Sequence, residues 1–172
     1  MKATYHILQA LPEHITALSD IERAAANLFP EEVLPNELRN QTISIETLEV
    51  ARQRRLLWVT VDTDNHPVGF ALLDDHGTTL HLEELDVHPD HQRQGIGRAM
   101  LEMIYQYALD AGYEGITLTT YSDIPWNAPW YKRLGFKVLK PVDLSPRLSA
   151  IMEAEAQRGL DPRLRVAMLK CV

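Results

Sequence analysis

Two glycines stand in the stretch HPDHQRQGIGRAML (88–101), between a polar run and an apolar-periodic segment that predicts a helix. In a first helical turn a glycine is less favourable than an alanine by about 1 kcal/mol, so these glycines must serve another purpose. A glycine-containing turn before a helix exposes backbone N–H groups at the positive end of the helix dipole, which suits a phosphate. Gly95 and Gly97 would let such a ligand approach the backbone, although the residues alone are equally compatible with a loop that happens to contain glycines.

Two common phosphate-binding patterns do not fit the turn. A P-loop requires a lysine followed by serine or threonine, where this chain has Arg98 and Ala99. The dinucleotide fingerprint fails as well, because its third small residue is missing and the turn before the glycines is too long.

A second group of reactive side chains precedes the turn, in the β-rich run LHLEELDV (80–87). Strand alternation places His81 and Glu83 on one face and Leu82 and Glu84 on the other, unless a bulge changes the phase. Because burying a charge is unfavourable, adjacent carboxylates in such a strand are expected to have partners.

These groups require a framework of strands and helices. Apolar and β-rich runs predict strands at 5–11, 56–62, 68–74, 80–87, 115–121, 136–142 and 163–170. Helical periodicity, prolines and glycines predict helices from Pro12 to before Pro30 and over 45–54, 95–112, 128–135 and 145–159, with 29–40 irregular. The order predicts an α/β (α+β) fold with a mixed sheet, antiparallel strands first and helices on both faces.

Composition excludes several classes of protein. The chain has 172 residues, a formal charge of −7 and no long basic cluster, which argues against nucleic-acid binding. No apolar run is long enough to span a membrane and the N-terminal residues lack the sections of a signal peptide, so we expect a cytoplasmic protein. The single cysteine, Cys171, excludes an internal disulfide, and the seven histidines show no metal-ligand spacing, so no metal is expected.

The glycine turn and its surroundings resemble the GNAT superfamily of acyl-CoA-dependent N-acyltransferases over nearly the whole chain. QRQGIG (92–97) fits the Q/R-x-x-G-x-G/A signature, LEELDVHPDH (82–91) resembles the fourth strand and its connection, and GITLTTYSD (115–123) resembles the fifth strand. NAPWYKRLGF (127–136) is similar to the family's Asn-x-x-x-Tyr-x-x-x-Gly-Phe element. The resemblance implies one GNAT domain over 1–172, with a mostly antiparallel sheet of about seven strands that splays between the fourth and fifth.

The resemblance also implies acetyl-CoA (coenzyme A) as co-substrate. Backbone amides of the turn would bind its diphosphate, the open edge of the fourth strand would hold the pantetheine arm, and an asparagine side chain would contact that arm. The corresponding cofactor-binding residues here are Leu85, Asp86, Val87, Gln92, Arg93, Gln94, Gly95, Ile96, Gly97, Arg98, Asn127 and Tyr131. The residue types alone also allow Leu85 and Val87 to be core residues of a continuous ladder and Asn127 to be a helix N-cap.

The chemistry implied is direct attack of an amine on the thioester. An alkylamine with a pKa near 10.4 is only about 0.04% neutral at pH 7, so a base must remove a proton. The family takes this base from strand-four positions, which here are Glu83 as first choice, then Glu84 and His81. Tyr131 matches the family's usual proton donor to the CoA sulfur, although its ring could instead simply pack beside Trp130.

By the same resemblance the acceptor enters from the side opposite the nucleotide, where Phe29, Glu31 and Trp126 would bind it. Aromatic rings and carboxylates there suit a cationic amine. We therefore expect an acetyltransferase acting on a primary amine of a small molecule. A protein N-terminal or lysine acceptor, or a non-catalytic acyl-CoA-sensing module, are the alternatives, and a homodimer is compatible because family members often dimerise.

Overall fold

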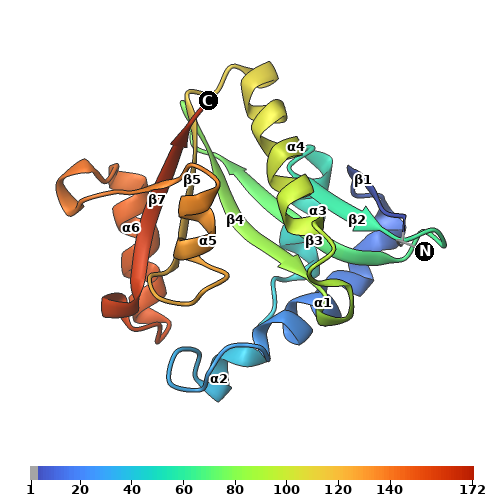
Figure 1. Ribbon diagram of the computed structural model, residues 1–172, viewed down its shortest axis with the longest axis horizontal. Helices are drawn as coiled ribbons and strands as arrows, with labels where there is room; N and C mark the ends of the chain where they lie inside the picture. The colour runs from blue at the N-terminus through green and yellow to red at the C-terminus, as the bar shows by residue number, and fades with distance from the viewer. Residues whose placement is uncertain (1–3) are drawn as a thin grey trace.

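One seven-stranded sheet organises the computed structural model, which describes residues 4–172 (Figure 1). Its strand order is β1-β2-β3-β4-β5-β7-β6, and all neighbours are antiparallel except the parallel pair β4 and β5. The strands are β1 (His6–Gln9), β2 (Leu57–Val61), β3 (Pro67–Asp75), β4 (Thr79–Val87), β5 (Gly115–Tyr121), β6 (Lys137–Val138) and β7 (Arg165–Cys171). The predicted mixed, mostly antiparallel sheet is confirmed.

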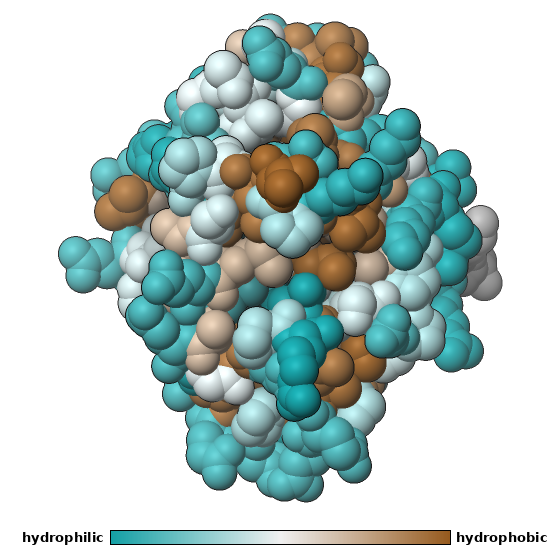
Figure 2. Space-filling view, turned by 90° about the vertical axis from the view of Figure 1, so that its left-hand side faces the viewer, coloured by the Kyte–Doolittle hydropathy of each residue, from teal (hydrophilic) through white to brown (hydrophobic). Residues whose placement is uncertain are grey.

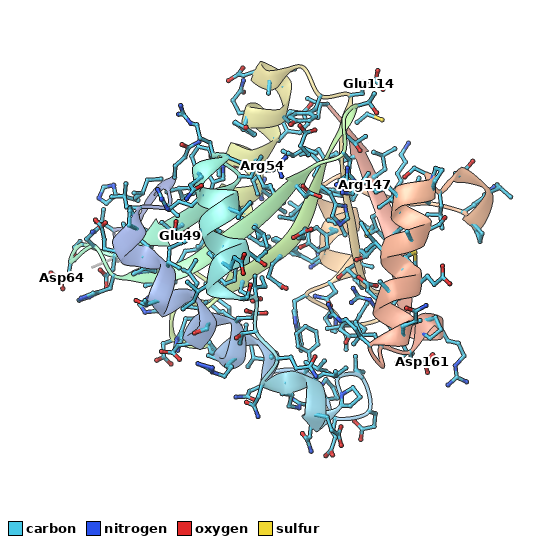
Figure 3. All side chains as sticks on the ribbon, turned by 180° about the vertical axis from the view of Figure 1, so that it is seen from behind. Glu49, Arg54, Asp64, Glu114, Arg147 and Asp161 are labelled. Atoms are coloured by element: carbon cyan, nitrogen blue, oxygen red, sulfur yellow. The ribbon has the colours of Figure 1, made fainter. Side chains whose placement is uncertain are left out.

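Helices cover both faces of the sheet, as the sequence predicted. They are α1 (Ile15–Ala26), α2 (Asn36–Arg39), α3 (Ile45–Gln53), α4 (Ile96–Ala111), α5 (Ala128–Arg133) and α6 (Pro146–Gln157). Figure 1 shows α4 and α5 in front of the sheet, and Figure 3, seen from behind, shows α1, α3 and α6 on the opposite face. The buried apolar core between these layers includes Phe70, Met100 and Ile104.

The strands β4 and β5 separate partway along their length. They pair only where Thr79–Leu82 meet Gly115–Leu118. Beyond that point β4 stays paired with β3 alone and β5 with β7 alone, so the two strands open into the V visible in Figure 1. The predicted splay between the fourth and fifth strands is therefore confirmed.

Two predicted segments differ from the structure. The run 136–142 forms only the two-residue strand β6, because Pro141 has no N–H to pair and starts a 3-10 turn, Pro141–Asp143. Within the segment 29–40, expected to be irregular, α2 forms a short helix. Its Arg39 donates to the backbone oxygens of Ala26 and Phe29 at 3.0 and 2.7 Å, which fixes this segment against the end of α1.

The edge beside β6 exposes apolar side chains among polar ones, on the side of the molecule that Figure 2 presents. Val138 is 41% exposed and Val142 is 88% exposed.

Within residues 4–172, no helix is both long and apolar enough to cross a membrane.

Candidate active site

A cavity of about 1170 Å³ begins where β4 and β5 separate. Its walls come from β4, the turn before α4, β5 and α5 on one side, and from α1, α2 and α6 on the other. Segments far apart in the sequence therefore contribute to one site, and the opening of the sheet is the feature that joins them.

The turn before α4 has the backbone conformation that anion binding requires. Arg93 and Gly95 adopt left-handed φ angles of 59° and 83°. The backbone N–H groups of residues 93–98 make no hydrogen bond to another backbone group within residues 4–172, and the first helical bond runs from Ala99 N–H to the Gly95 oxygen at 3.0 Å. A side chain at Gly97 would reach only the ring of Trp130, at 3.5 Å, so the surface above these amides is open to a ligand.

A β-bulge at Glu83 determines which side chains of β4 share a face. Leu73 pairs with Leu82 and Leu72 with Glu84, so Glu83 has no partner on β3. The alternation of β3 then places His81, Glu84 and Asp86 on the same face of the sheet. The simple alternation that would put His81 with Glu83 therefore applies only before the bulge.

Three carboxylates meet on this face: Glu84, Asp86 and Glu22 of α1. Burial, reinforced by Glu22, raises the pKa of Glu84 to about 7 despite the opposing charge of Arg165. Burial and the charges of Glu84 and Glu22 raise the pKa of Asp86 well above its ordinary value, and burial also raises the pKa of Glu22. None of the three forms an ion pair within the described part of the chain.

The other two base candidates have different surroundings. Glu83 is more exposed, and partial burial and the charge of Asp74 raise its pKa. His81 is buried, its Nδ1 lies 2.9 Å from the hydroxyl oxygen of Thr117, and its ring stacks on His76 with centroids 4.6 Å apart. Burial and His76 lower the pKa of His81 to about 4, so the imidazole is neutral at pH 7.

Tyr131 faces the carboxylates from the other side of the opening. It is 8% exposed, and its ring packs against Phe136 and Trp130 with centroids 5.4 and 4.9 Å away. Burial and the charges of Glu84 and Asp86 raise the pKa of its phenol. The phenol is therefore neutral at physiological pH and available to donate a proton.

Asn127 occupies the N-cap position of α5, but its side chain makes no capping hydrogen bond and instead lines the cavity. The N-cap role that the residue type allows is thus not used. Gln92, also at the cavity, donates from its side chain to the Val87 oxygen at 3.2 Å, which ties the turn to the end of β4.

Aromatic residues line the part of the cavity beyond the carboxylates. The ring of Phe29 lies 5.3 Å from that of Tyr121 and 5.6 Å from that of Trp126. The guanidinium of Arg165 stacks on Tyr121 at 4.6 Å and is bound to Glu155 of α6 at 2.9 Å.

All the site residues predicted from the sequence line the cavity, except Gln94 and Glu31. Gln94 lines a separate small hollow beside β1, and the exposed Glu31 accepts a hydrogen bond from Asn36 at 2.6 Å. Sequence reasoning missed Glu22, Glu155 and Arg165, because each is a charged residue in an ordinary helix or strand pattern. Only the fold shows that they face the carboxylates of β4.

Comparison with known proteins identifies relatives of this chain. The sequence model of the acetyltransferase (GNAT) family matches residues 16–136. A peptidyl-lysine N-acetyltransferase, YjaB, of Salmonella typhimurium is 37% identical over 82 residues, which are 48% of this chain and 50% of that protein. The chain thus spans about half the length of the curated relatives it matches.

Solved structures share the fold over nearly the whole chain. The PaiA N-acetyltransferase from Thermoplasma acidophilum, in complex with coenzyme A, has a TM-score of 0.72 at 18% identity and covers 98% of this chain and 99% of its own. The N-acetylglutamate synthase from Neisseria gonorrhoeae, complexed with coenzyme A and N-acetyl-glutamate, has a TM-score of 0.74 at 17% identity, covering 99% of this chain and 36% of its own.

Proposed function

Because this chain belongs to the GNAT family of acetyltransferases, we propose that it transfers an acetyl group from acetyl-CoA to a primary amine of a small molecule. The observation that carries the proposal is the pairing of Glu84, whose pKa is about 7, with the neutral phenol of Tyr131 at the opening between β4 and β5. One group can accept a proton near neutral pH and the other can donate one.

The residues around the opening fit a coenzyme A molecule. Free amides of residues 93–98 at the start of α4 would hold the diphosphate, with Arg93 and Arg98 adding positive charge. The unpaired edge of β4 over Leu85–Val87 would bind the amide groups of the pantetheine arm, and the Asn127 side chain would reach it from α5. Bound there, acetyl-CoA supplies an activated thioester.

The residues then have distinct tasks in the reaction. The carboxylates attract the acceptor as an ammonium ion, and Glu84 takes one of its protons. The neutral nitrogen bonds to the acetyl carbon while the carbon–sulfur bond breaks, and Tyr131 gives its proton to the departing sulfur. The nitrogen is positively charged after it bonds to the acetyl carbon, and it gives its second proton to the Tyr131 phenolate, which restores the phenol. The products are an N-acetyl amine and coenzyme A with a free thiol, and Glu84 releases its proton to solvent.

Glu84 suits the role of base better than the other two candidates. A base is most effective when its pKa lies near the working pH, which holds for Glu84. The pKa of His81, about 4, makes it a weak base, and its Nδ1 is engaged with Thr117. Glu83 lies at the bulge, more exposed to solvent and beside Arg147.

A small acceptor has room in the acceptor region of the cavity, which Leu38 of α2 and Ile151 of α6 both line. The name of the 37%-identical relative favours a second candidate, in which the side chain of a peptide lysine enters the same cavity.

The test is release of the CoA thiol from acetyl-CoA by the purified protein with amines, polyamines, amino acids and lysine peptides. We expect acceptor-dependent release that falls about 100-fold in Glu84→Gln and in Tyr131→Phe, with coenzyme A affinity little changed. Glu83→Gln serves as the matched control. Bound acetyl-CoA without release for any acceptor would contradict the proposal, and release with peptides alone would favour the lysine candidate.

A further inference from the structure

The acceptor region of the cavity combines one charged end with apolar walls. From this arrangement we infer that the acceptor is a primary amine with an apolar, aromatic-sized body and no carboxylate, and that Glu22 binds its ammonium group. The inference rests on the proposed function and specifies its substrate class.

The charged end is oriented by contacts within the protein. Oε2 of Glu22 accepts a hydrogen bond from the Ile43 N–H at 2.9 Å, which holds the carboxylate toward the cavity beside Glu84 and Asp86. A cation placed among these unpaired groups would relieve their mutual repulsion. An ammonium held by Glu22 would also lie beside the base that must deprotonate it.

Tyr121 adds an aromatic ring with a polar end to this region. The residue is 5% exposed and lines the cavity, and its ring lies 5.3 Å from that of Phe29. A phenol in this place can pack its ring on an apolar acceptor and offer its hydroxyl to the acceptor or to water.

Much of the wall around the charged end is apolar, next to the polar Gln41, Thr119 and Thr120. The apolar side chains are Leu28, Phe29, Leu38, Trp126, Ile151 and Ala154. Leu28 and Trp126 remain 40% and 45% exposed, although both border the cavity. An acceptor with an apolar body would cover this surface, whereas a polyamine would place further charges against it.

The arginines on this side are poorly placed to bind a carboxylate. Arg165 is already paired with Glu155, and Arg39 donates to two backbone oxygens. Arg158 is exposed at the rim, and its charge already acts on Glu22 and Glu84, whose pKa values it lowers. A carboxylate on the acceptor would therefore have to compete with Glu22 and Glu84 for this cation.

The experiment compares kcat/KM for 2-phenylethylamine and phenylalanine, which differ only by a carboxylate, together with ethylamine, spermidine and a lysine peptide. We expect 2-phenylethylamine to exceed phenylalanine and spermidine by at least about tenfold. In Glu22→Gln we expect the KM for 2-phenylethylamine to rise about tenfold while kcat changes much less.

A variant that fills the cavity tests the apolar wall. Ala154→Phe should lower kcat/KM for 2-phenylethylamine at least about tenfold and leave ethylamine nearly unchanged. Ala150→Phe is the matched control, because both alanines are exposed on α6 but Ala150, one turn earlier, lies outside the cavity wall.

Preference for phenylalanine or spermidine, or an equal loss with both amines in Ala154→Phe, would overturn the inference while leaving the acetyltransferase proposal intact. Absence of transfer to every acceptor, with acetyl-CoA still bound, would instead contradict the proposed function itself.

Discussion

A single side chain, Glu84, has the main property that the proposed amine acetylation requires of a base. Its pKa of about 7 arises from burial and from the neighbouring Glu22, and Arg165 limits the shift. A base that is half ionised near neutral pH is both available and strong enough to accept a proton. The bulge at Glu83 is what turns this residue into the cavity.

This pKa predicts the pH dependence of the reaction. With an amine acceptor, kcat should rise as pH increases through about 7, because Glu84 must be ionised to accept a proton. Steady-state kinetics between about pH 5.5 and 9 measure the profile, and Glu84→Gln should remove the inflection. An unchanged inflection in Glu84→Gln, or its loss in the control Glu83→Gln, would assign the titration to another group.

At the scale of the elements, a partly buried ion pair helps to hold α6 against the sheet. Glu155 of α6 accepts hydrogen bonds from Arg165 of β7 and from the Thr119 hydroxyl of β5, and the side chains of Arg165 and Glu155 are only 12% and 13% exposed. Glu155→Ala leaves the Arg165 charge without its partner. We expect a loss of about 3 kcal/mol in the free energy of unfolding, measured with urea.

Glu153→Ala, on the exposed side of the same helix, is the control for this loss and should change the free energy by less than about 0.5 kcal/mol. Equal effects of the two substitutions would mean that the ion pair contributes no more than helix propensity does. If Glu155→Ala instead lost activity while its free energy of unfolding stayed unchanged, Glu155 would act in the site and would not stabilise the fold.

The elements also show what the sequence can and cannot predict. Periodicity and turn residues were sufficient for α1, α4 and six of the seven strands, since the pattern of each segment agrees with its place in the fold. The strand predicted at 136–142 was too long, because a β-rich composition does not reveal that Pro141 ends the pairing. The segment 29–40 gave no helical pattern, since Arg39 fixes α2 through contacts with distant backbone oxygens.

Residues that line the cavity could be named from the sequence where a short motif marks them, as at the glycine turn and around Tyr131. It was not predictable where the fold alone brings charges together. Glu22 lies more than sixty residues before Glu84 in the sequence, and no local pattern links α1 to β4. Whether Glu83 or Glu84 faces the cavity likewise depends on the bulge. The bulge changes which residues of β4 share a face, and no residue type in the sequence indicates its position.

For the whole molecule, the pH range of stability is limited by two sets of side chains. The pKa values are raised in one set and lowered in the other. Glu84, Asp86 and Glu22 have pKa values raised above their ordinary range, so the stability they contribute is present below about pH 4.5 and is lost as pH rises through their folded pKa values. His81 and His76 have lowered pKa values, so their contribution is present above about pH 6.5 and is lost as pH falls, for His81 toward about 4.

The thermal midpoint should therefore pass through a maximum between these limits, in mildly acidic solution, and fall on both sides. Glu84→Gln should raise the midpoint at pH 8 more than at pH 5, because it removes a charge that is unfavourable only when ionised. His81→Asn should make the fall on the acid side less steep, because the imidazole of His81 no longer has to accept a proton in a buried place. Thermal unfolding followed by circular dichroism from about pH 4 to 9 measures all three profiles. If the Glu84→Gln profile ran parallel to that of the parent protein across this range, the carboxylates would have to be hydrated in the folded state, and the basis for Glu84 as a base at neutral pH would be lost with them.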